Sequence, residues 1–358
     1  MVREPKGMDI KLKTVVHRIY NHLADKQSQD IFQSRMMYSL TNDYRFIMDV
    51  VNMLPQSQQL NTLISTIPDI SSELIMYGAG SEFNRIICAF PQIKFKCLCD
   101  KNPEKQKIGW HGYDVISPQE LFENYKDSYV MIVSSKYWRE IYEELTSGGV
   151  PEGQIINVGK ISAELLDLQY FDTDIVRPAL NEIFIDAGCF DCETDLSFRK
   201  WCDGAYEKIY AFEPDIQNYK KCQVIIERKR IENIYLFPNG LWEEKKTLNF
   251  SMQQSQRSKV INKGNERIVT IEGVPLDEIV GEDKVTFIKM DVEGSELEAL
   301  RGARNTIRQN RPKLAISIYH RDNDIFEIPD YVLSLHSDYR LYIRHYSLGP
   351  EETVLYAI

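Results

Sequence analysis

Two well-separated stretches of this sequence each run from a strand-like segment into an acidic residue with a glycine close by. Residues 182–191 read E-I-F-I-D-A-G-C-F-D, and residues 286–298 read T-F-I-K-M-D-V-E-G-S-E-L-E. A buried parallel strand of this kind delivers its acidic residue to the carboxyl edge of a sheet, where ligands bind in open α/β folds. The next run, K-I-Y-A-F-E-P-D, ends at Glu213. We therefore expect Asp186 and Glu213 to frame a nucleoside-bearing cofactor.

Length and charge narrow the class of protein. With 358 residues, the chain is long enough for two α/β domains of roughly 150 residues each. The formal net charge of -10 argues against a nucleic-acid partner. No apolar run approaches the ~18 residues of a membrane span, and the first residues lack the apolar core of a signal peptide. Seven scattered cysteines fit free thiols in a reducing compartment. We expect a cytoplasmic protein without a membrane or nucleic-acid partner.

The N-terminal segment, residues 1–70, is expected to be helical. Apolar residues recur at helical spacing from Leu12 to Leu23 and again from Phe46 to Leu54, where Pro55 ends the pattern. The polar positions between them carry no chemistry that we recognise. We expect an amphipathic lead-in that packs on the next domain or on a second copy of the chain, which makes it a candidate homodimer surface.

Residues 71–160 predict a small α/β domain that begins with half of a dinucleotide-binding fingerprint. A strand over 73–77 leads into Gly78-Ala79-Gly80 and a helix, and the next strand ends at Asp100. Glycines permit the tight turn, and an acidic residue about 20 positions on can bind a ribose. The third glycine is missing, because Phe83 stands in its place. A nucleotide or sugar-nucleotide site at Gly78, Gly80 and Asp100 and a scaffold with an empty crevice both remain open.

This front domain continues through further strands and helices. Ser117, Pro118 and Glu120 form a helix-start signal, and strands are expected over 130–134 and 154–158. The segments G-A-G, C-D-K-N-P and W-H-G-Y-D-V-I-S-P resemble the small Rossmann-like domains that precede enzymes of surface-sugar biosynthesis, without a catalytic signature. We assign residues 161–181 to a linker.

The last domain, residues 182–358, is expected to hold a seven-stranded mixed sheet whose last strand is antiparallel. The expected strands are 183–186, 208–212, 233–237, 285–290, 313–319, 339–345 and 353–357. A short loop at 347–350 makes the final pair antiparallel. This layout resembles that of class I S-adenosylmethionine-dependent methyltransferases. A polar insertion at 245–272 predicts two extra strands around a loop, Q-Q-S-Q-R-S-K, that could close over a substrate.

Residues 182–358 also resemble the FkbM family of methyltransferases. The matching segments are F-I-D-A-G-C-F-D, Y-A-F-E-P-D, F-I-K-M-D-V-E-G-S-E-L-E-A-L-R-G-A, L-A-I-S-I-Y-H, R-H-Y-S and E-T-V-L-Y-A-I. The resemblance implies S-adenosylmethionine as the cofactor and transfer of its methyl group to a hydroxyl of a sugar, glycan or related natural product, as in carbohydrate biosynthesis.

The resemblance and the residue chemistry together assign the cofactor site to Asp186, Gly188, Glu213 and Asp291. Gly188 lets the backbone approach the ligand without a Cβ in the way. Glu213 can accept both ribose hydroxyls, and Asp186 can orient loop amides or meet the positive methionine portion. The family's second motif glycine is replaced by Cys192, where a positive φ would cost about 1–2 kcal/mol.

Cys192 also creates a C-x-x-C pair with Cys189. Such pairs occur in redox and zinc sites. No second cysteine pair or cysteine–histidine pair follows at zinc-site spacing, so the pair is best explained as a coincidence within the cofactor loop, and we predict no metal site.

Asp291, Glu293 and Glu296 follow the fourth expected strand of the last domain. Three such acids can bind a cation, hold sugar hydroxyls or stabilise a helix start. We assign Glu293, Glu296 and His345 to substrate contact. His320, which follows the fifth strand, is the expected general base by residue type and position, and Asp291 is the next candidate.

Two other functional classes remain open. An oxidoreductase or binding protein could use the front Gly-Ala-Gly turn for a nicotinamide or sugar nucleotide, although no hydride-site acid or base is evident. A non-catalytic scaffold could retain a methyltransferase fold, and only Cys192 points to it.

Overall fold

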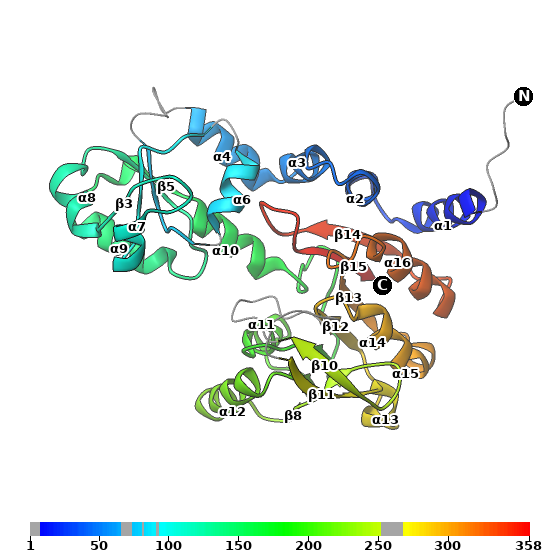
Figure 1. Cartoon of the computed structure of the whole chain (residues 1–358). Helices are drawn as coiled ribbons and strands as arrows, with labels where there is room; N and C mark the ends of the chain where they lie inside the picture. Colours follow the sequence, from blue (N-terminus) through cyan, green and yellow to red (C-terminus); the bar gives the residue numbers. More distant parts are fainter. Residues whose placement is uncertain (1–7, 66–73, 81, 91–92, 252–267) are drawn as a thin grey trace, which may run out of the picture. The chain divides into compact units, whose positions relative to one another are not determined.

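A computed structural model describes residues 8–65, 74–80, 82–90, 93–251 and 268–358 (Figure 1). The chain divides into two compact units, which are described separately. The large unit comprises Met1–Asn42, Leu168–His345 and Glu351–Ile358, and the small unit comprises Asp43–Asp167 and Tyr346–Pro350. Among the described residues, every helix is too short or too polar to span a bilayer.

The small unit is built around a parallel five-stranded sheet. Its strands lie in the order β3-β2-β1-β4-β5. The chain adds β2 and β3 on one side of β1 and then β4 and β5 on the other, as in doubly wound α/β sheets. The strands are β1 (Leu74–Tyr77), β2 (Cys97–Cys99), β3 (Val115–Ile116), β4 (Tyr129–Ile132) and β5 (Ile155–Asn157). The pattern of the sequence predicts four of them. It misses β3, which is too short to show an alternation.

The helices of the small unit include one that the sequence assigned to the linker. They are α3 (Arg45–Asn52), α4 (Pro55–Ser65), α6 (Glu82–Ala89), α7 (Pro103–Ile108), α8 (Pro118–Asn124), α9 (Trp138–Ser147), a 3-10 turn (Glu152–Gln154) and α10 (Val158–Leu168). Helix α8 begins as predicted, because the hydroxyl of Ser117 accepts a hydrogen bond from the Glu120 amide. The linker prediction over 161–181 is wrong in its first part. Val158, Ile161 and Leu165 are buried at helical spacing, so α10 continues to residue 168.

The large unit contains the predicted seven-stranded sheet, in the order β14-β15-β13-β12-β6-β7-β8. Strand β15 runs antiparallel to both β13 and β14, and the other neighbouring strands pair parallel. The strands are β6 (Glu182–Ala187), β7 (Tyr206–Phe212), β8 (Ile234–Phe237), β12 (Phe287–Met290), β13 (Lys313–Ser317), β14 (Leu341–His345) and β15 (Thr353–Ala357). Residues of β6 and β12 are buried on both faces, as parallel central strands require.

Helices cover both faces of this sheet. They are α11 (Glu193–Trp201), α12 (Ile216–Lys229), α13 (Leu276–Val280), α14 (Glu296–Gly302), α15 (Arg304–Asn310) and α16 (Asp324–Leu335). Helices α14, α15 and α16 pack together, on the opposite side of the sheet from α11 and α12 in Figure 1. Stacked rings of Phe184 and Phe198, with centroids 4.2 Å apart, join α11 to β6.

The two expected extra strands are also present. Strands β10 (Lys246–Ser251) and β11 (Ile268–Val274) pair antiparallel, and β9 (Gly240–Leu241) extends them to a small sheet. The loop Q-Q-S-Q-R-S-K lies outside the described residues, so its expected role as a lid stays a prediction.

The N-terminal helices pack on the C-terminal sheet. Helix α1 (Met8–His22) packs on α16, and α2 (Lys26–Thr41) packs on β14 and α16. Asp25 begins α2 by accepting a hydrogen bond from the Ser28 amide at 2.8 Å, and it also pairs with Arg344 of β14 at 2.6 Å. The sequence predicted that this segment packs on the next domain or on a second copy. Its first two helices pack on the end of the same chain in the large unit, and α3 and α4 belong to the small unit. The homodimer surface stays a prediction.

Candidate active site

The carboxyl ends of three neighbouring strands build the site. Ala187 of β6 pairs with Phe212 of β7 on one side and with Met290 of β12 on the other. The residues that follow these strands therefore meet at one edge of the sheet, as their positions in the sequence predict.

Asp186 is buried in the sheet and paired with a lysine. Its carboxylate lies 2.9 Å from the Nζ of Lys289, and both side chains are 2% exposed or less. Burial raises the pKa of Asp186, and the Lys289 charge opposes that shift. The ammonium of Lys289 also donates to the carbonyl of Gly188 at 2.7 Å. Asp186 therefore holds the loop after β6 through Lys289. The carboxylate has no exposed surface, which favours this orienting role over direct contact with the methionine portion of the cofactor.

Gly188 is required by the packing of the backbone. Its φ is +80°, and a Cβ at this position would lie 1.9 Å from the carbonyl oxygen of Asp291. No side chain fits there without moving the end of β12. The close approach that the sequence predicted is therefore present, and its partner in this structure is the neighbouring strand end.

Glu213 holds the same loop from the other side. Its two carboxylate oxygens accept hydrogen bonds from the amides of Phe190 at 3.0 Å and Asp215 at 2.8 Å. Burial raises the pKa of Glu213 to about 8, although these amide donors oppose the shift. Each oxygen keeps a lone pair that could accept a further hydroxyl.

Cys192 has the strained backbone that the sequence predicted for the missing glycine. Its φ is +59° and its ψ is 14°, in the left-handed region, immediately before α11. The side chain is fully buried. The loop therefore keeps the conformation of a glycine-containing turn at the cost of about 1–2 kcal/mol.

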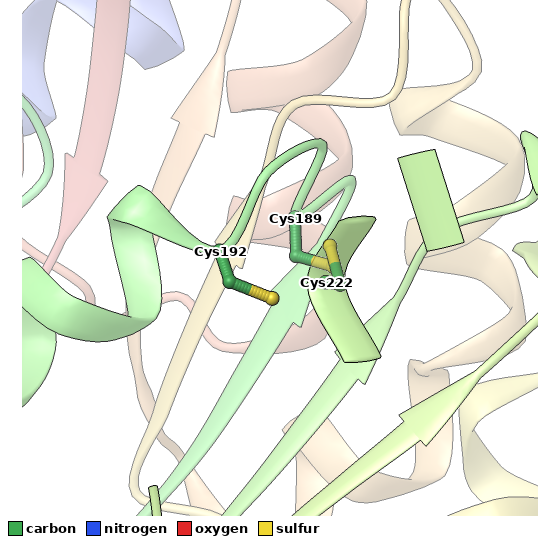
Figure 2. Close-up of side chains that lie close together, drawn as sticks. All are labelled: Cys189, Cys192 and Cys222. Atoms are coloured by element: carbon green, nitrogen blue, oxygen red, sulfur yellow. The ribbon is translucent and has the colours of Figure 1, made fainter. Parts of the chain in front are cut away.

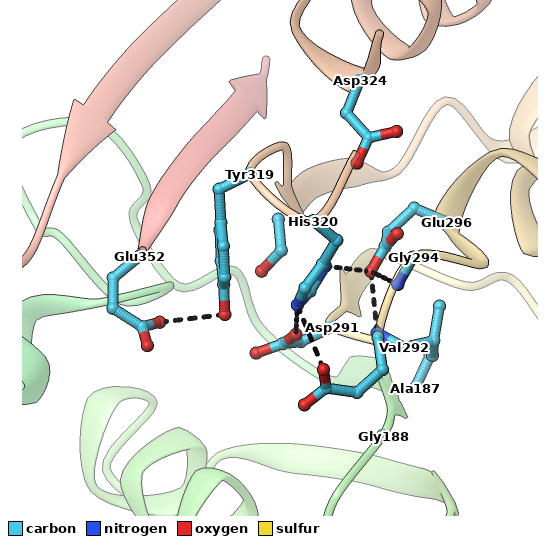
Figure 3. Close-up of polar contacts among 12 residues, drawn as sticks. Ala187, Gly188, Asp291, Val292, Gly294, Glu296, Tyr319, His320, Asp324 and Glu352 are labelled. Atoms are coloured by element: carbon cyan, nitrogen blue, oxygen red, sulfur yellow. Dashed lines mark hydrogen bonds and ion pairs between the residues drawn. The ribbon is translucent and has the colours of Figure 1, made fainter. Parts of the chain in front are cut away.

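A cluster of three acids and one histidine lies beyond β12 and β13 (Figure 3). The Nδ1 of His320 lies 2.8 Å from Glu296, and its Nε2 lies 3.4 Å from Asp291 and 3.7 Å from Glu293. Glu296 is buried and also accepts the amides of Val292 at 2.9 Å and Gly294 at 3.3 Å. Glu296 therefore shapes the turn and orients the imidazole, and it has no surface for the substrate contact assigned to it from the sequence.

The charges of this cluster decide the protonation of His320. Burial lowers the pKa of His320, but Glu296 and the two other carboxylates outweigh it and raise the pKa to about 10. The imidazole is therefore a cation at neutral pH and cannot accept a proton there. This argues against the role of general base that the sequence predicted.

Glu293 has the protonation behaviour that a base near neutral pH requires. Burial raises its pKa to about 7, with the positive His320 opposing and Asp291 adding to the shift. Its side chain is 27% exposed, and its φ is +53°, which is uncommon for a residue other than glycine. Backbone strain of this kind is concentrated at functional sites.

Three tyrosine and glutamate side chains that the sequence did not single out border the cluster. The hydroxyl of Tyr170 donates to Asp291 at 2.7 Å, and that of Tyr319 donates to Glu352 at 3.3 Å. Tyr170 lies in the stretch assigned to the linker, where nothing in the sequence marks it.

Lys289 could have been found from the sequence, because a lysine inside the apolar run F-I-K-M requires a buried partner.

His345 forms a hydrogen bond on the neighbouring strand. It is buried, and its Nδ1 lies 2.8 Å from the hydroxyl of Thr353 on the paired strand β15. Its expected contact with a substrate stays a prediction, while the hydrogen bond supports its role in the β14–β15 pair.

The glycine turn of the small unit is held by a side chain of the same unit, Asp100. Asp100 accepts the amide of Ala79 at 2.9 Å and pairs with Lys105 at 3.2 Å. Gly78 has a φ of +116°, whereas Gly80 has open space where a Cβ would lie. These contacts use the carboxylate that would bind a ribose, which favours the scaffold over the nucleotide site.

Two groups of side chains in the described ranges could hold a metal ion. Asp291, Glu296 and His320 bring ligand atoms within 4.8 Å of one another, as do Cys189, Cys192 and Cys222. In the first group the cationic His320 already supplies positive charge to the carboxylates. Near the second group, Lys221 acts on the thiol of Cys222, and Lys289 acts on that of Cys189.

Comparison with protein families decides the class of the large unit. Residues 191–347 match the methyltransferase FkbM domain. These residues form an FkbM methyltransferase domain. Residues 70–156 match the model described as C2185-like, N-terminal, which covers the five-stranded sheet of the small unit.

Several solved structures are similar to all or part of this chain. The methyltransferase FkbM from Methylobacillus flagellatus KT is 19% identical, with a TM-score of 0.50, over 89% of this chain and 100% of that one. SMU.1697c from Streptococcus mutans, in complex with SAH, is 15% identical over 55% of this chain and 97% of that one, with a TM-score of 0.35. A SAM-dependent methyltransferase from Aquifex aeolicus is 14% identical over 55% and 96%, with a TM-score of 0.30. A search of curated proteins finds no match.

The FkbM domain begins within the loop that follows β6 and ends just after β14. It therefore spans Glu213 and the whole acid–histidine cluster. The sequence resemblance to FkbM methyltransferases is confirmed, and so is the expected seven-stranded mixed sheet.

Proposed function

We propose that the FkbM domain binds S-adenosylmethionine at the ends of β6 and β7 and transfers its methyl group to a hydroxyl of a sugar, glycan or related natural product. The observation that supports this most directly is the meeting of Glu213, the Gly188 loop and Asp291 at one sheet edge. The carboxyl edge of such a sheet is where open α/β folds bind their ligands.

The residues at this edge fit the cofactor. Glu213 keeps a free lone pair on each oxygen and would accept the ribose hydroxyls, while its bonds to two amides fix its orientation. S-adenosylmethionine supplies a methyl group that is already activated by a neighbouring positive sulfur. The protein's main task is therefore to align the acceptor oxygen with that methyl group.

The acid–histidine cluster is the proposed acceptor side. Asp291 and Glu293 are partly exposed, with side-chain exposures of 24% and 27%, so they could accept hydrogen bonds from sugar hydroxyls. Glu293 would take the acceptor's proton, because its pKa of about 7 lies close to neutral pH. The cationic His320 would hold these carboxylates together and offset their mutual repulsion. Asp291 is the second candidate for the base.

The first test is calorimetric titration with S-adenosylmethionine. We expect micromolar binding by the full chain and a loss of about 10- to 100-fold in Glu213→Ala, which removes the proposed hydrogen-bond partner of the ribose hydroxyls. Glu207→Ala is the matched control, because Glu207 lies exposed on the same strand β7 and should leave the affinity unchanged. A folded wild type that does not bind would overturn the proposal.

A second test addresses the acceptor. With labelled cofactor and a panel of sugar nucleotides, glycans and glycosides, we expect label in an O-methyl product. The rate should rise with pH through about 7 as Glu293 loses its proton. Glu293→Gln should remove that rise while the cofactor still binds. A profile that is unchanged in Glu293→Gln would shift the role of base to Asp291.

A further inference from the structure

Three cysteines from two separate parts of the large unit come together in the folded chain (Figure 2). Cys189 and Cys192 lie in the loop between β6 and α11, and Cys222 lies in α12. Their sulfur atoms all lie within 4.8 Å of one another, and those of Cys189 and Cys222 are 3.9 Å apart. All three are buried free thiols.

These separations match those of a thiolate metal site. Zinc binds thiolates at about 2.3 Å in tetrahedral geometry, which places two sulfur ligands about 3.8 Å apart. Cys189 and Cys222 have almost this spacing without an ion. The third sulfur needs only a small side-chain adjustment to reach the same centre.

A buried carboxyl group lies beside one of these cysteines. Asp195, in the first turn of α11, is fully buried, and its carboxyl group contacts the thiol of Cys192. Apart from this contact with a weakly donating thiol, its oxygens have no hydrogen-bond partner among the described residues. Buried carboxyl groups without a partner are costly, and an ion would compensate for that cost.

We infer that Cys189, Cys192 and Cys222 bind one thiophilic divalent cation of the zinc type. The sequence alone does not reveal this site, because Cys222 follows Cys189 by 33 positions and lies on another helix. Binding would release the thiol protons, since the thiolate is the ligand. The inference does not depend on methyl transfer.

The site would fix the loop that the proposed cofactor uses. Phe190 lies between the two loop cysteines, its amide donates to Glu213, and its carbonyl accepts from the thiol of Cys222 at 3.4 Å. An ion that joins Cys189 and Cys192 to Cys222 would tie this loop to α12. Its role would therefore be structural, because it would hold the loop in place against the helix.

The test is a cobalt titration of the full chain, prepared free of metal in a non-chelating reductant. Zinc is spectroscopically silent, whereas tetrahedral Co²⁺ bound to thiolates absorbs strongly. We expect one equivalent of Co²⁺ per chain to give a sulfur-to-cobalt band, zinc to displace it, and zinc to raise the thermal midpoint. Cys222→Ala should lose the band.

Cys202→Ala is the matched control, because Cys202 is also buried beside α11 but lies outside the cluster. It should keep the band and the stoichiometry. Cys192→Gly guards against misfolding, since glycine suits the positive φ at this position. This variant should stay folded by circular dichroism and bind Co²⁺ at least 10-fold more weakly.

Three results would overturn the inference. The first is a wild type without a thiolate band in the presence of Co²⁺, and the second is a band that persists in Cys222→Ala. The third is a disulfide among the three cysteines, found by peptide mapping after mild oxidation, in a chain that binds no metal when reduced. The first result would leave the thiols as small apolar groups in the core.

Discussion

At the scale of single residues, the buried pair of Asp186 and Lys289 is the feature that most constrains the site. Both side chains lie in the centre of the seven-stranded sheet, almost completely removed from water. A buried ion pair contributes little compared with an apolar pair, but the loss of one partner leaves an uncompensated charge. The pair therefore fixes the loop after β6, but a substitution of either partner alone would destabilise the fold.

We expect Lys289→Met to lower the free energy of unfolding by about 3–5 kcal/mol, measured with urea. The double variant Asp186→Asn, Lys289→Met should recover most of that loss, because it removes both charges. Lys208→Met is the control, since its pair with Asp283 is partly exposed and should contribute less than about 1 kcal/mol. A Lys289→Met loss as small as that of the control would show that the pair is not buried in solution.

The protonation of His320 can be tested without a substrate. In NMR spectra its imidazole should stay protonated through neutral pH and titrate only near its pKa of about 10. Glu296→Gln should move that pKa back towards the ordinary value. Glu298→Gln is the control, because Glu298 of the same helix pairs with Arg321 instead. A midpoint near 6.5 in the wild type would contradict the assigned charge and would restore His320 as a base.

The same raised pKa makes stability depend on pH. The folded chain binds the proton of His320 more tightly than the unfolded chain does. Its contribution is therefore complete below the unfolded pKa of about 6.5 and is lost as pH rises through about 10. In chemical unfolding, His320→Gln should be less stable than the wild type at pH 6, and this difference should shrink by pH 10. A difference that is constant with pH would contradict the ion pairs.

At the scale of elements, the start of α2 shows how the N-terminal helices are joined to the C-terminal sheet. Asp25 caps the helix and pairs with Arg344 of β14, and the hydroxyl of Ser28 accepts the amide of Ile343 at 3.0 Å. One turn of helix therefore satisfies polar groups at the edge strand of the sheet, which would otherwise be open to pairing with another chain.

We expect Asp25→Ala to destabilise the chain by about 1–2 kcal/mol, because it removes a helix cap together with an ion pair. The measurement is the shift in the urea midpoint. Asp30→Ala, in the same helix, removes only an exposed pair with Lys26 and should change stability by less than about 0.5 kcal/mol. Equal effects of the two substitutions would mean that α2 is not docked on β14.

At the scale of the whole molecule, the two units offer two candidate nucleotide crevices. Hydrogen exchange with and without S-adenosylmethionine distinguishes them. A ligand at 100 times its dissociation constant stabilises the state that binds it by about 2.7 kcal/mol. With the cofactor present, we expect slower hydrogen exchange in residues 183–192 and 209–215. Exchange in residues 74–80 and 97–100 should be unchanged. Slower exchange in residues 74–80 and 97–100, with S-adenosylmethionine or with NADH, would favour the alternative function in the small unit.

Much of the fold could be predicted, because each strand of the large sheet carries its own local signal. The runs that end at Asp186, Glu213 and Asp291 are apolar, β-branched and aromatic, and each forms a strand of the observed sheet. The predictions were wrong where local signals compete or are too short. Strand β3 has two residues, and α10 was hidden by the expectation of a linker.

The sequence by itself determined the fold class, the positions of most strands along the chain and the acidic residues at their ends. These features depend on periodicity and on residue type at short range. Only the tertiary structure decided the charges and partners of those residues. Lys289 neutralises Asp186, three carboxylates make His320 a cation, and Cys222 joins Cys189 and Cys192. Each of these depends on burial and on distances between segments far apart in the chain, which no local pattern encodes.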